Sequence, residues 1–204
     1  VGTTDGLVLY REGKFAAFAG LAGTAVLAVL EDREGNYWIG TDANGLSLLR
    51  TKKVTTYTTR DGLSANIVRS IYGDRTGKVW IGMQERGLNL LSNGQVNSFP
   101  AQQRLANDDV MTICEDQEAN LWIGTSDGLK RINAGAITKF TVKDGLADNY
   151  IRSLYAGRDG GLWIGTRRGL TQYKQGEFTT YTMLDGLASD LVGAISEDRQ
   201  GNLW

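Results

Sequence analysis

Histidine is absent from this 204-residue chain, which also has only one cysteine and one proline. Because histidine is the commonest general base and metal ligand, its absence excludes Ser-His-Asp and Cys-His nucleophilic sites. The single cysteine, Cys114, excludes a disulfide within the chain and a zinc site built from several thiolates. Enzymes that depend on these groups are therefore excluded, and we expect neither a metal nor another cofactor.

A surplus of positive charge is missing as well, since 22 basic side chains stand against 23 acidic ones, for a net charge of −1. Nucleic acid and anionic membranes are bound by bulk electrostatics only where a basic field exists, so we expect neither as a partner. No apolar run approaches the roughly 18 residues of a membrane helix, and no signal peptide is seen. The first residue is Val1 rather than methionine, from which we expect a mature or excised piece of a protein, or an engineered chain.

Glycine is abundant, with 27 residues against a usual share of roughly 7%, and it takes part in an internal repeat. Five tryptophans recur at intervals of 42, 42, 41 and 41 residues, and the first four are each followed by Ile-Gly: Trp38, Trp80, Trp122, Trp163 and Trp204. The last three residues, Asn-Leu-Trp, joined to the first three, Val-Gly-Thr, match the sequence from Asn120 to Thr125 except that valine stands in place of Ile123. The chain therefore holds five whole units and is cut inside a strand.

Each unit contains four strand signals, which in the unit of Trp80 are Val68–Tyr72, Val79–Gly82, Gly87–Leu91 and Gln95–Phe99. An Asn-Gly pair between the last two is a strong hairpin signal, and no segment has the period of an amphipathic helix. Four antiparallel strands repeated about every 40 residues are typical of β-propeller blades, which must pack on one another to form a core. We predict an all-β fold, a single propeller domain over residues 1–204 with five four-stranded blades.

The cut predicts how the ring closes. The C-terminal segments Leu191–Glu197 and Leu203–Trp204 are expected to pair with N-terminal strands at Gly6–Tyr10 and Lys14–Phe18, so that both ends build one blade. Closure would remove the open sheet edges that invite aggregation. If five blades do not close alone, the chain is expected to associate with itself.

The recurring order of Asp-Gly-Leu, a glycine-containing turn, Trp-Ile-Gly and Gly-Leu resembles the two-component regulator propeller repeats. The best copies run from Asp61 to Leu88 and from Asp144 to Leu170, and the likeness covers essentially the whole chain. The resemblance implies the periplasmic or extracellular sensing part of a bacterial signalling protein. Such parts are commonly joined through a membrane helix to a histidine kinase or a diguanylate cyclase, and polysaccharide sensing is the best-known role.

Several recurring residues allow a functional and a structural interpretation. The tryptophans could form a sugar-stacking platform, but packing between blades is favoured, with close backbone approach within the sheet at the glycines at 2, 40, 82, 124 and 165. The alternate spacing of Asp32, Glu34 and Asn36 is compatible with a calcium loop, but a hairpin turn capped by the aspartate is favoured.

The Asp-Gly-Leu loops contain three aspartates, Asp61, Asp144 and Asp185. They too allow a functional and a structural interpretation. Two carboxylates suffice for glycoside hydrolysis. However, an aspartate of this kind occurs at most once per blade, which places the three on different blades, and each precedes a turn-forming glycine. We therefore favour loop scaffolding. Cys114 stands in the column of Tyr72 and Tyr155, where we expect a small buried hydrophobic residue.

The candidate ligand-binding residues lie where the repeats differ, on the face shared by the blade connections and the loops between second and third strands. In the loops these residues are Asp42, Asn44, Gln84, Glu85, Arg86, Arg167 and Arg168. Arg69 and Arg152 occupy one column of the innermost strands. Two arginines near the axis are suited to clamp a carboxylate or a sulfated or uronic sugar, although ordinary solvated charge is the alternative.

Three function classes remain. The leading hypothesis is a non-catalytic sensor that binds a small molecule or a glycan. The second is an engineered or excised scaffold with no ligand of its own. The third, a propeller lyase or glycoside-active enzyme, is disfavoured because the chain has no histidine.

Overall fold

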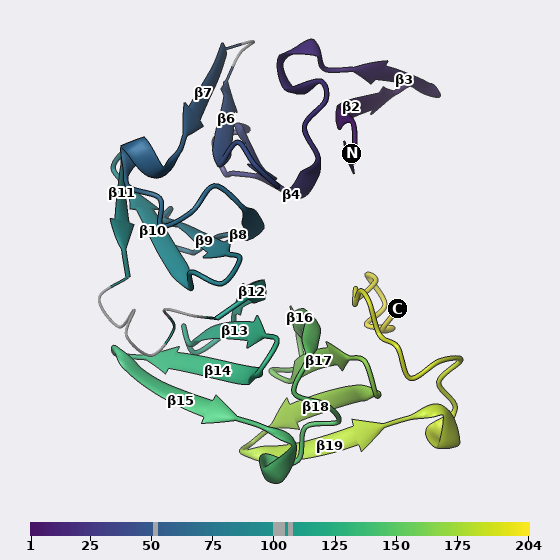
Figure 1. The fold of residues 1–204 in the computed structure, drawn as a ribbon. Coiled ribbons are helices and arrows are strands. Elements are labelled where there is room, and N and C mark those ends of the chain that lie inside the picture. The colour runs from purple at the N-terminus through teal and green to yellow at the C-terminus, as the bar shows by residue number, and fades with distance from the viewer. Residues whose placement is uncertain (51–52, 100–104, 106–107) are drawn as a thin grey trace. The chain divides into compact units, whose positions relative to one another are not determined.

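Antiparallel hairpins form every sheet of the computed structural model, which describes residues 1–50, 53–99, 105 and 108–204 (Figure 1). The chain falls into two compact units, an N-terminal unit of residues 1–109 and a C-terminal unit of residues 110–204. In every sheet the strands lie side by side in chain order. Such blades need no crossover connection, because a tight turn joins each strand to the next.

The N-terminal unit contains one three-stranded and two four-stranded sheets. The three-stranded sheet consists of β1 (Gly2–Thr3), β2 (Gly6–Arg11) and β3 (Lys14–Ala17). The next consists of β4 (Val26–Glu31), β5 (Tyr37–Thr41), β6 (Leu46–Arg50) and β7 (Lys53–Tyr57). The third consists of β8 (Val68–Gly73), β9 (Val79–Met83), β10 (Leu88–Ser92) and β11 (Gln95–Ser98).

The C-terminal unit contains two further four-stranded sheets. One consists of β12 (Val110–Glu115), β13 (Leu121–Thr125), β14 (Gly128–Asn133) and β15 (Ala136–Phe140). The other consists of β16 (Ile151–Ala156), β17 (Leu162–Thr166), β18 (Leu170–Lys174) and β19 (Glu177–Tyr181). The prediction of antiparallel, propeller-type blades is confirmed.

The predicted strand over Leu191–Glu197 is wrong in its extent. Within the described part of the chain its one β pairing is the isolated bridge from Glu197 to Leu203, beside which Ser196 and Trp204 exchange two backbone hydrogen bonds of 2.9 and 2.7 Å. The reason is local, because only two residues follow the turn and they can form only the last rungs of a hairpin. Pairing of the two chain ends stays a prediction.

Short 3₁₀ helices, which were not predicted, join the blades. They are η1 (Ala19–Leu21), η2 (Thr59–Asp61), η4 (Val142–Asp144) and η5 (Met183–Asp185). In η2 the Asp61 carboxylate accepts hydrogen bonds from the backbone N–H of Thr58 at 2.8 Å and from its hydroxyl at 3.0 Å. Asp144 and Asp185 repeat this capping box. The scaffolding role of the Asp-Gly-Leu aspartates is therefore confirmed.

Blades pack through their glycines. A Cβ atom built on Gly40 of β5 would lie 2.6 Å from Cγ1 of Val68, on the first strand of the next sheet. One built on Gly124 of β13 would lie 2.6 Å from Cγ2 of Ile151. The predicted close approach within the sheet occurs at Gly124, where Thr112 Cγ2 also lies 2.6 Å from a Cβ, but Gly40 and Gly124 approach the next sheet as well. Apolar side chains of the second strands, such as Ile39 and Ile81, are fully buried.

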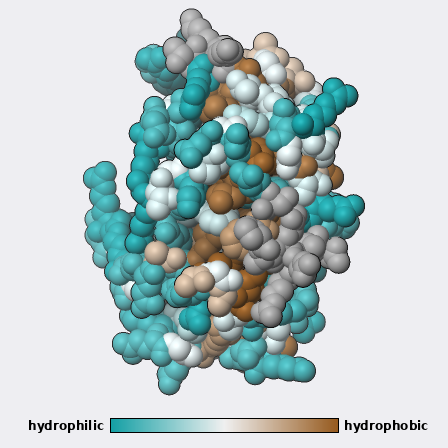
Figure 2. All heavy atoms as spheres, turned by 90° about the vertical axis from the view of Figure 1, so that its left-hand side faces the viewer, coloured by the Kyte–Doolittle hydropathy of each residue, from teal (hydrophilic) through white to brown (hydrophobic). Residues whose placement is uncertain are grey.

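The outermost strands carry the polar surface. Thr55 and Thr56 on β7 are exposed, whereas Leu46 and Leu48 on the adjoining β6 are buried. Figure 2 shows that hydrophilic side chains cover most of the face on this side, with hydrophobic atoms visible between them in limited patches.

A repeated hydrogen-bonded turn connects the first and second strands of a blade. In β4–β5 the Asp32 carboxylate accepts hydrogen bonds from the backbone N–H groups of Glu34 and Asn36, from the Asn36 amide and from Trp38 Nε1 at 2.9 Å. Asp74, Asp116 and Asp198 bond their own tryptophans in the same way. The favoured interpretation, a turn capped by its aspartate, is confirmed. Trp38 and Trp122 are buried, Trp80 and Trp163 are half-buried, and Trp204 is exposed.

These turns depress acidic pKa values. Burial raises the pKa of Asp74, but hydrogen bonds from Thr76, Trp80 and Lys78 outweigh it, so that the pKa lies below the usual value of 3.8. Hydrogen bonds from Asn202 and Trp204 lower the pKa of Asp198 to about 2. A carboxylate with a depressed pKa in the folded state contributes stability that is present above the unfolded-state pKa and is lost as the pH falls through the folded-state pKa.

Replacing Gly40 by alanine is expected to lower the free energy of unfolding by about 1–3 kcal/mol, because the new methyl group overlaps Val68 on the next sheet. Chemical denaturation measures the change. Gly193→Ala is the control, since a Cβ there meets nothing within 4 Å. Equal effects of the two substitutions would show that glycine flexibility, rather than blade spacing, is at stake.

Acid is expected to destabilise the protein as the pH falls from about 4 towards 2. Asp74→Asn should lose about 1–2 kcal/mol of stability at neutral pH, because a charged hydrogen-bond acceptor is lost. It should also flatten the acid limb of the stability curve, since one of the depressed carboxylates no longer titrates. Urea midpoints measured across this pH range test this, and parallel curves for wild type and variant would contradict it.

Candidate functional site

The arginines of the inner-strand column sit on β-bulges. In β8 the pairing with β9 skips a residue between Val68 and Ser70, and in β16 the pairing with β17 skips one between Ile151 and Ser153. Arg69 and Arg152 are the skipped residues. A bulge leaves one residue outside the ladder and redirects its side chain. The same bulge recurs in the other complete blades, where it carries Leu27 and Met111.

Loops between second and third strands are tied to the blade connections. In the N-terminal unit the backbone N–H of Gln84 donates to the Ile67 carbonyl at 3.1 Å, and that of Gly87 donates to the Asp108 carbonyl at 3.1 Å. In the C-terminal unit the N–H of Gly128 donates to the Asn149 carbonyl at 2.7 Å. The prediction that these two sets of segments share one face is therefore confirmed within each unit.

Arg69 is neutralised inside the N-terminal unit. Its Nη2 atom donates to Oε1 of Gln84 at 2.6 Å, and its Nε atom lies 3.4 Å from Oδ1 of Asp109. About a third of the Arg69 side chain and a fifth of the Asp109 side chain are exposed. One partner, Gln84, comes from the loop of its own blade, and the other, Asp109, directly precedes the next inner strand. The Arg69 guanidinium therefore already interacts with groups of the protein.

Arg152 lacks both of those partners, although it occupies the same position of its blade. The residue that follows the second strand, Gln84 in the blade of Arg69, is here Arg167. The position of Asp109, which directly precedes the inner strand β12, is here taken by Leu191, which is 55% exposed. Arg152 itself is exposed. Its side chain forms no ion pair or hydrogen bond with the residues that the structure describes.

Arg167 stacks on an aromatic ring. Unlike that of Gln84, its side chain has no acceptor atom to offer the neighbouring arginine. Its guanidinium carbon lies 3.5 Å from the centre of the Tyr150 ring, and the Tyr150 hydroxyl lies 3.9 Å from the Met111 sulfur. The backbone N–H of Tyr150 donates to the carboxylate of Asp148 at 3.2 Å. Stacking holds the guanidinium plane in place and leaves its N–H edge available for hydrogen bonds.

The remaining candidates contribute less. Asp42, Glu85 and Arg168 are exposed. Asn44 donates from Nδ2 to the Thr24 hydroxyl at 2.9 Å, which fastens its loop to the connection before β4. Arg86 is exposed and uses its carbonyl to accept a hydrogen bond from the Ser64 hydroxyl at 3.2 Å.

Among the predicted candidates, the structure brings Arg69 into contact with Gln84, whereas joint action of Arg69 and Arg152 on one ligand stays a prediction. Asp109 and Tyr150 were not among the predicted residues. Both precede an inner strand, one repeat apart, so the alignment of the repeats contained the signal. Cys114 is buried as predicted, and burial, followed by the charge of Asp116, raises the pKa of its thiol to about 12.

Two solved structures of similar fold are extracellular domains from B. thetaiotaomicron. One belongs to a protein described as a hybrid two component system and matches 96% of this chain with a TM-score of 0.83 and 25% identity. The other belongs to one described as a one component system and matches 100% with a TM-score of 0.84 and 25% identity. This chain spans 29% of the length of each.

Enzymes share the fold as well. Virginiamycin B lyase from Staphylococcus aureus matches 88% of this chain and 62% of its own, with a TM-score of 0.70 and 17% identity, a likeness that shows the fold alone. No curated protein sequence matches the chain. Within the described residues, no helix has the length and apolar character needed to span a membrane.

The repeats themselves match a family model. The two component regulator propeller model matches residues 20–43, 62–85, 104–127 and 145–168. Each match begins in a blade connection and extends past the second strand, so it contains the bulge and the tryptophan of one blade. The matched segments recur in step with the blades, and the chain belongs to the two-component regulator propeller family.

Proposed function

We propose that this chain is a non-catalytic, ligand-binding part of a bacterial signalling protein and that it acts outside the cytoplasm. Family membership supports the signalling role, and the two extracellular domains of similar fold support the location. The proposed ligand is an anion, namely the carboxylate or sulfate group of an acidic saccharide. The likeness to lyases supports the fold and carries no activity to this chain.

The observation that carries this proposal is the pair Arg152 and Arg167. Two guanidiniums occupy the positions at which the blade of Arg69 has an arginine and its glutamine acceptor. Two cations cannot hydrogen-bond to each other, and each keeps N–H donors for an acceptor from outside. A carboxylate or sulfate between them would accept charge-assisted hydrogen bonds and relieve their mutual repulsion.

The arrangement also favours a saccharide over a free ion. Tyr150 lies beneath Arg167 and brings an aromatic ring next to the cationic pair. Arg168 follows in the same loop and is exposed, so it can contact a second acidic group of a longer chain. Because these groups are exposed, screening by salt should weaken the binding.

Arg152→Ala and Arg167→Ala are each expected to weaken binding of a sulfated disaccharide at least tenfold, because each removes a charge-assisted hydrogen-bond donor worth about 1.5–3 kcal/mol. Isothermal titration calorimetry at two salt concentrations measures this, and inorganic sulfate serves as the small-ion comparison. Lys143→Ala is the control for loss of one exposed positive charge.

Three results would count against the proposal. Absence of binding by the wild type would favour a scaffold with no ligand. Equal losses for Lys143→Ala and Arg152→Ala would reduce the site to general electrostatics. Conversion of the saccharide into a product would contradict the non-catalytic role.

A further inference from the structure

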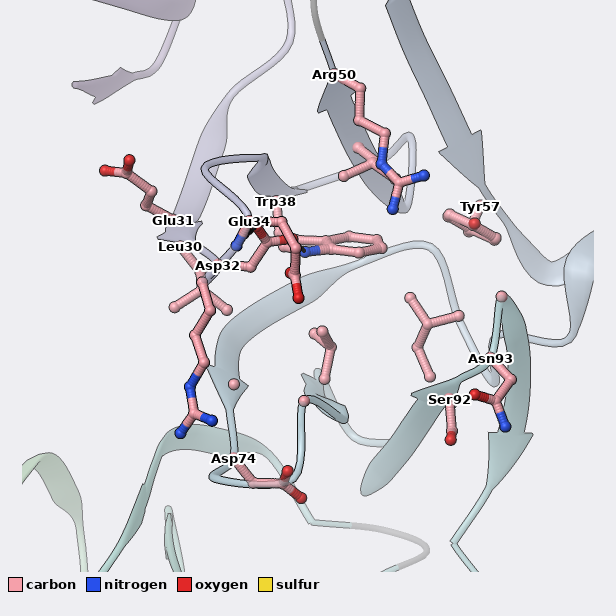
Figure 3. Close-up of a pocket in the computed structure, with 17 residues that line it drawn as sticks. Leu30, Glu31, Asp32, Glu34, Trp38, Arg50, Tyr57, Asp74, Ser92 and Asn93 are labelled. Carbon is pink, nitrogen blue, oxygen red and sulfur yellow. Dashed lines mark hydrogen bonds between the residues drawn. The ribbon is translucent and has the colours of Figure 1, made fainter.

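A groove separates two neighbouring sheets of the N-terminal unit, away from the arginines of the inner strands. It lies between the β4–β7 and β8–β11 sheets and has a volume of about 540 Å³, within the range of roughly 300–1,000 Å³ of small-molecule sites. Figure 3 shows Trp38 reaching across it, with Glu34 and Asp74 from the turns on one side and Arg50 and Tyr57 on the other. The Trp38 and Tyr57 ring centres lie 6.2 Å apart.

The same groove exists between the two sheets of the C-terminal unit, where it is only about 290 Å³ in volume. There the protein fills it with its own cation. The guanidinium carbon of Arg131 lies 5.6 Å from the centre of the Trp122 ring and 5.7 Å from that of Phe140. Arg131 also donates from Nη1 to the Tyr173 hydroxyl at 3.4 Å.

Strand register identifies what replaces these residues in the larger groove. Leu48 pairs with Trp38 as Arg131 pairs with Trp122, and Leu91 pairs with Val79 as Tyr173 pairs with Leu162. Tyr57, which pairs with Leu46, takes the place of Phe140. The tryptophan and one further ring are therefore kept, while the guanidinium and its tyrosine partner are replaced by leucines.

The two grooves also differ in charge, and the larger one is the more acidic. The smaller groove is lined by Asp116 and Glu118 and by the cations Arg131 and Lys174, which balance. In the larger groove Asp32 and Glu34 keep the acidic positions, but leucine and Ser92 replace both cations. Glu31 and Asp74 add negative charge, and Arg33 and Arg50 offset only part of it, with Arg33 donating to the Arg75 carbonyl at 2.8 Å.

We propose that the groove of the N-terminal unit binds an alkylguanidinium small molecule, whose cation stacks at Trp38 and Tyr57 as Arg131 stacks at Trp122 and Phe140. Glu34 is its counterion, and the alkyl chain contacts Leu48 and Leu91. The site is distinct from the proposed anion site, because it lies in the other unit and takes the opposite charge.

Titration with butylguanidinium, followed through the indole N–H signals of the tryptophans by NMR, tests this. We expect the Trp38 signal to shift with saturation and the Trp122 signal to stay in place. Butylurea, which has the same shape without the charge, is expected to give no saturable shift. Absence of a Trp38 shift with butylguanidinium, or equal shifts with both compounds, would overturn the proposal.

Matched substitutions sharpen the test. Glu34→Gln should weaken binding about tenfold, whereas Glu118→Gln, at the same position of the groove that Arg131 fills, should leave it unchanged. Leu48→Arg should abolish binding by supplying the internal cation, and Arg50→Ala should strengthen it by removing a repelling charge. Equal effects of Glu34→Gln and Glu118→Gln would overturn the proposal even if Leu48→Arg failed to fold. Arg152→Ala should not change butylguanidinium binding, so the two sites can fail independently.

Discussion

Within each unit, the close approach of one sheet's second strand to the first strand of the next sheet is the constraint on which the positions of the bulged side chains depend. Gly40 meets Val68 and Gly124 meets Ile151 at distances that leave no space for a Cβ atom. Each of these contacted residues directly precedes the residue skipped by the bulge. The glycine contact thus fixes the strand one residue before Arg69 or Arg152 leaves the ladder. Blade packing and the placement of the bulged side chain are therefore one geometric feature.

Because the blades are repeats, equivalent positions in different blades can be compared directly. Arg69 and Arg152 share backbone position, bulge and strand register, but one is occupied and the other free of recorded partners among the described residues. Arg69 is paired with Gln84 and Asp109. The equivalent positions for Arg152 hold Arg167 and Leu191, which offer no acceptor side chain. A side chain's role is set here by the neighbouring loop and the next blade rather than by its own strand.

The sequence allowed the strands to be predicted because they depend on local signals. Trp-Ile-Gly repeats mark second strands, and Asn93 and Gly94 both adopt positive φ at the hairpin that their pair predicts. The bulges could not be predicted, since a skipped residue leaves the pattern of apolar residues almost unchanged. Asp109 was missed because it acts across blades, 40 residues from Arg69. Tyr150 was missed because its stacking on Arg167 of its own blade depends on the folded loop. The groove was missed because its volume depends on the size of Leu48 and Leu91.

Each unit pairs one arginine with its own residues and leaves one charged site without a full counter-charge among the described residues. The N-terminal unit neutralises Arg69 and leaves its acidic groove without the cation that Arg131 supplies elsewhere. The C-terminal unit fills its groove with Arg131 and leaves Arg152 and Arg167 without acidic partners among the described residues. The net charge of −1 therefore conceals local fields of opposite sign. Composition correctly argues against partners held by bulk charge, such as nucleic acid, but it carries no information about small charged ligands, which respond to two or three side chains.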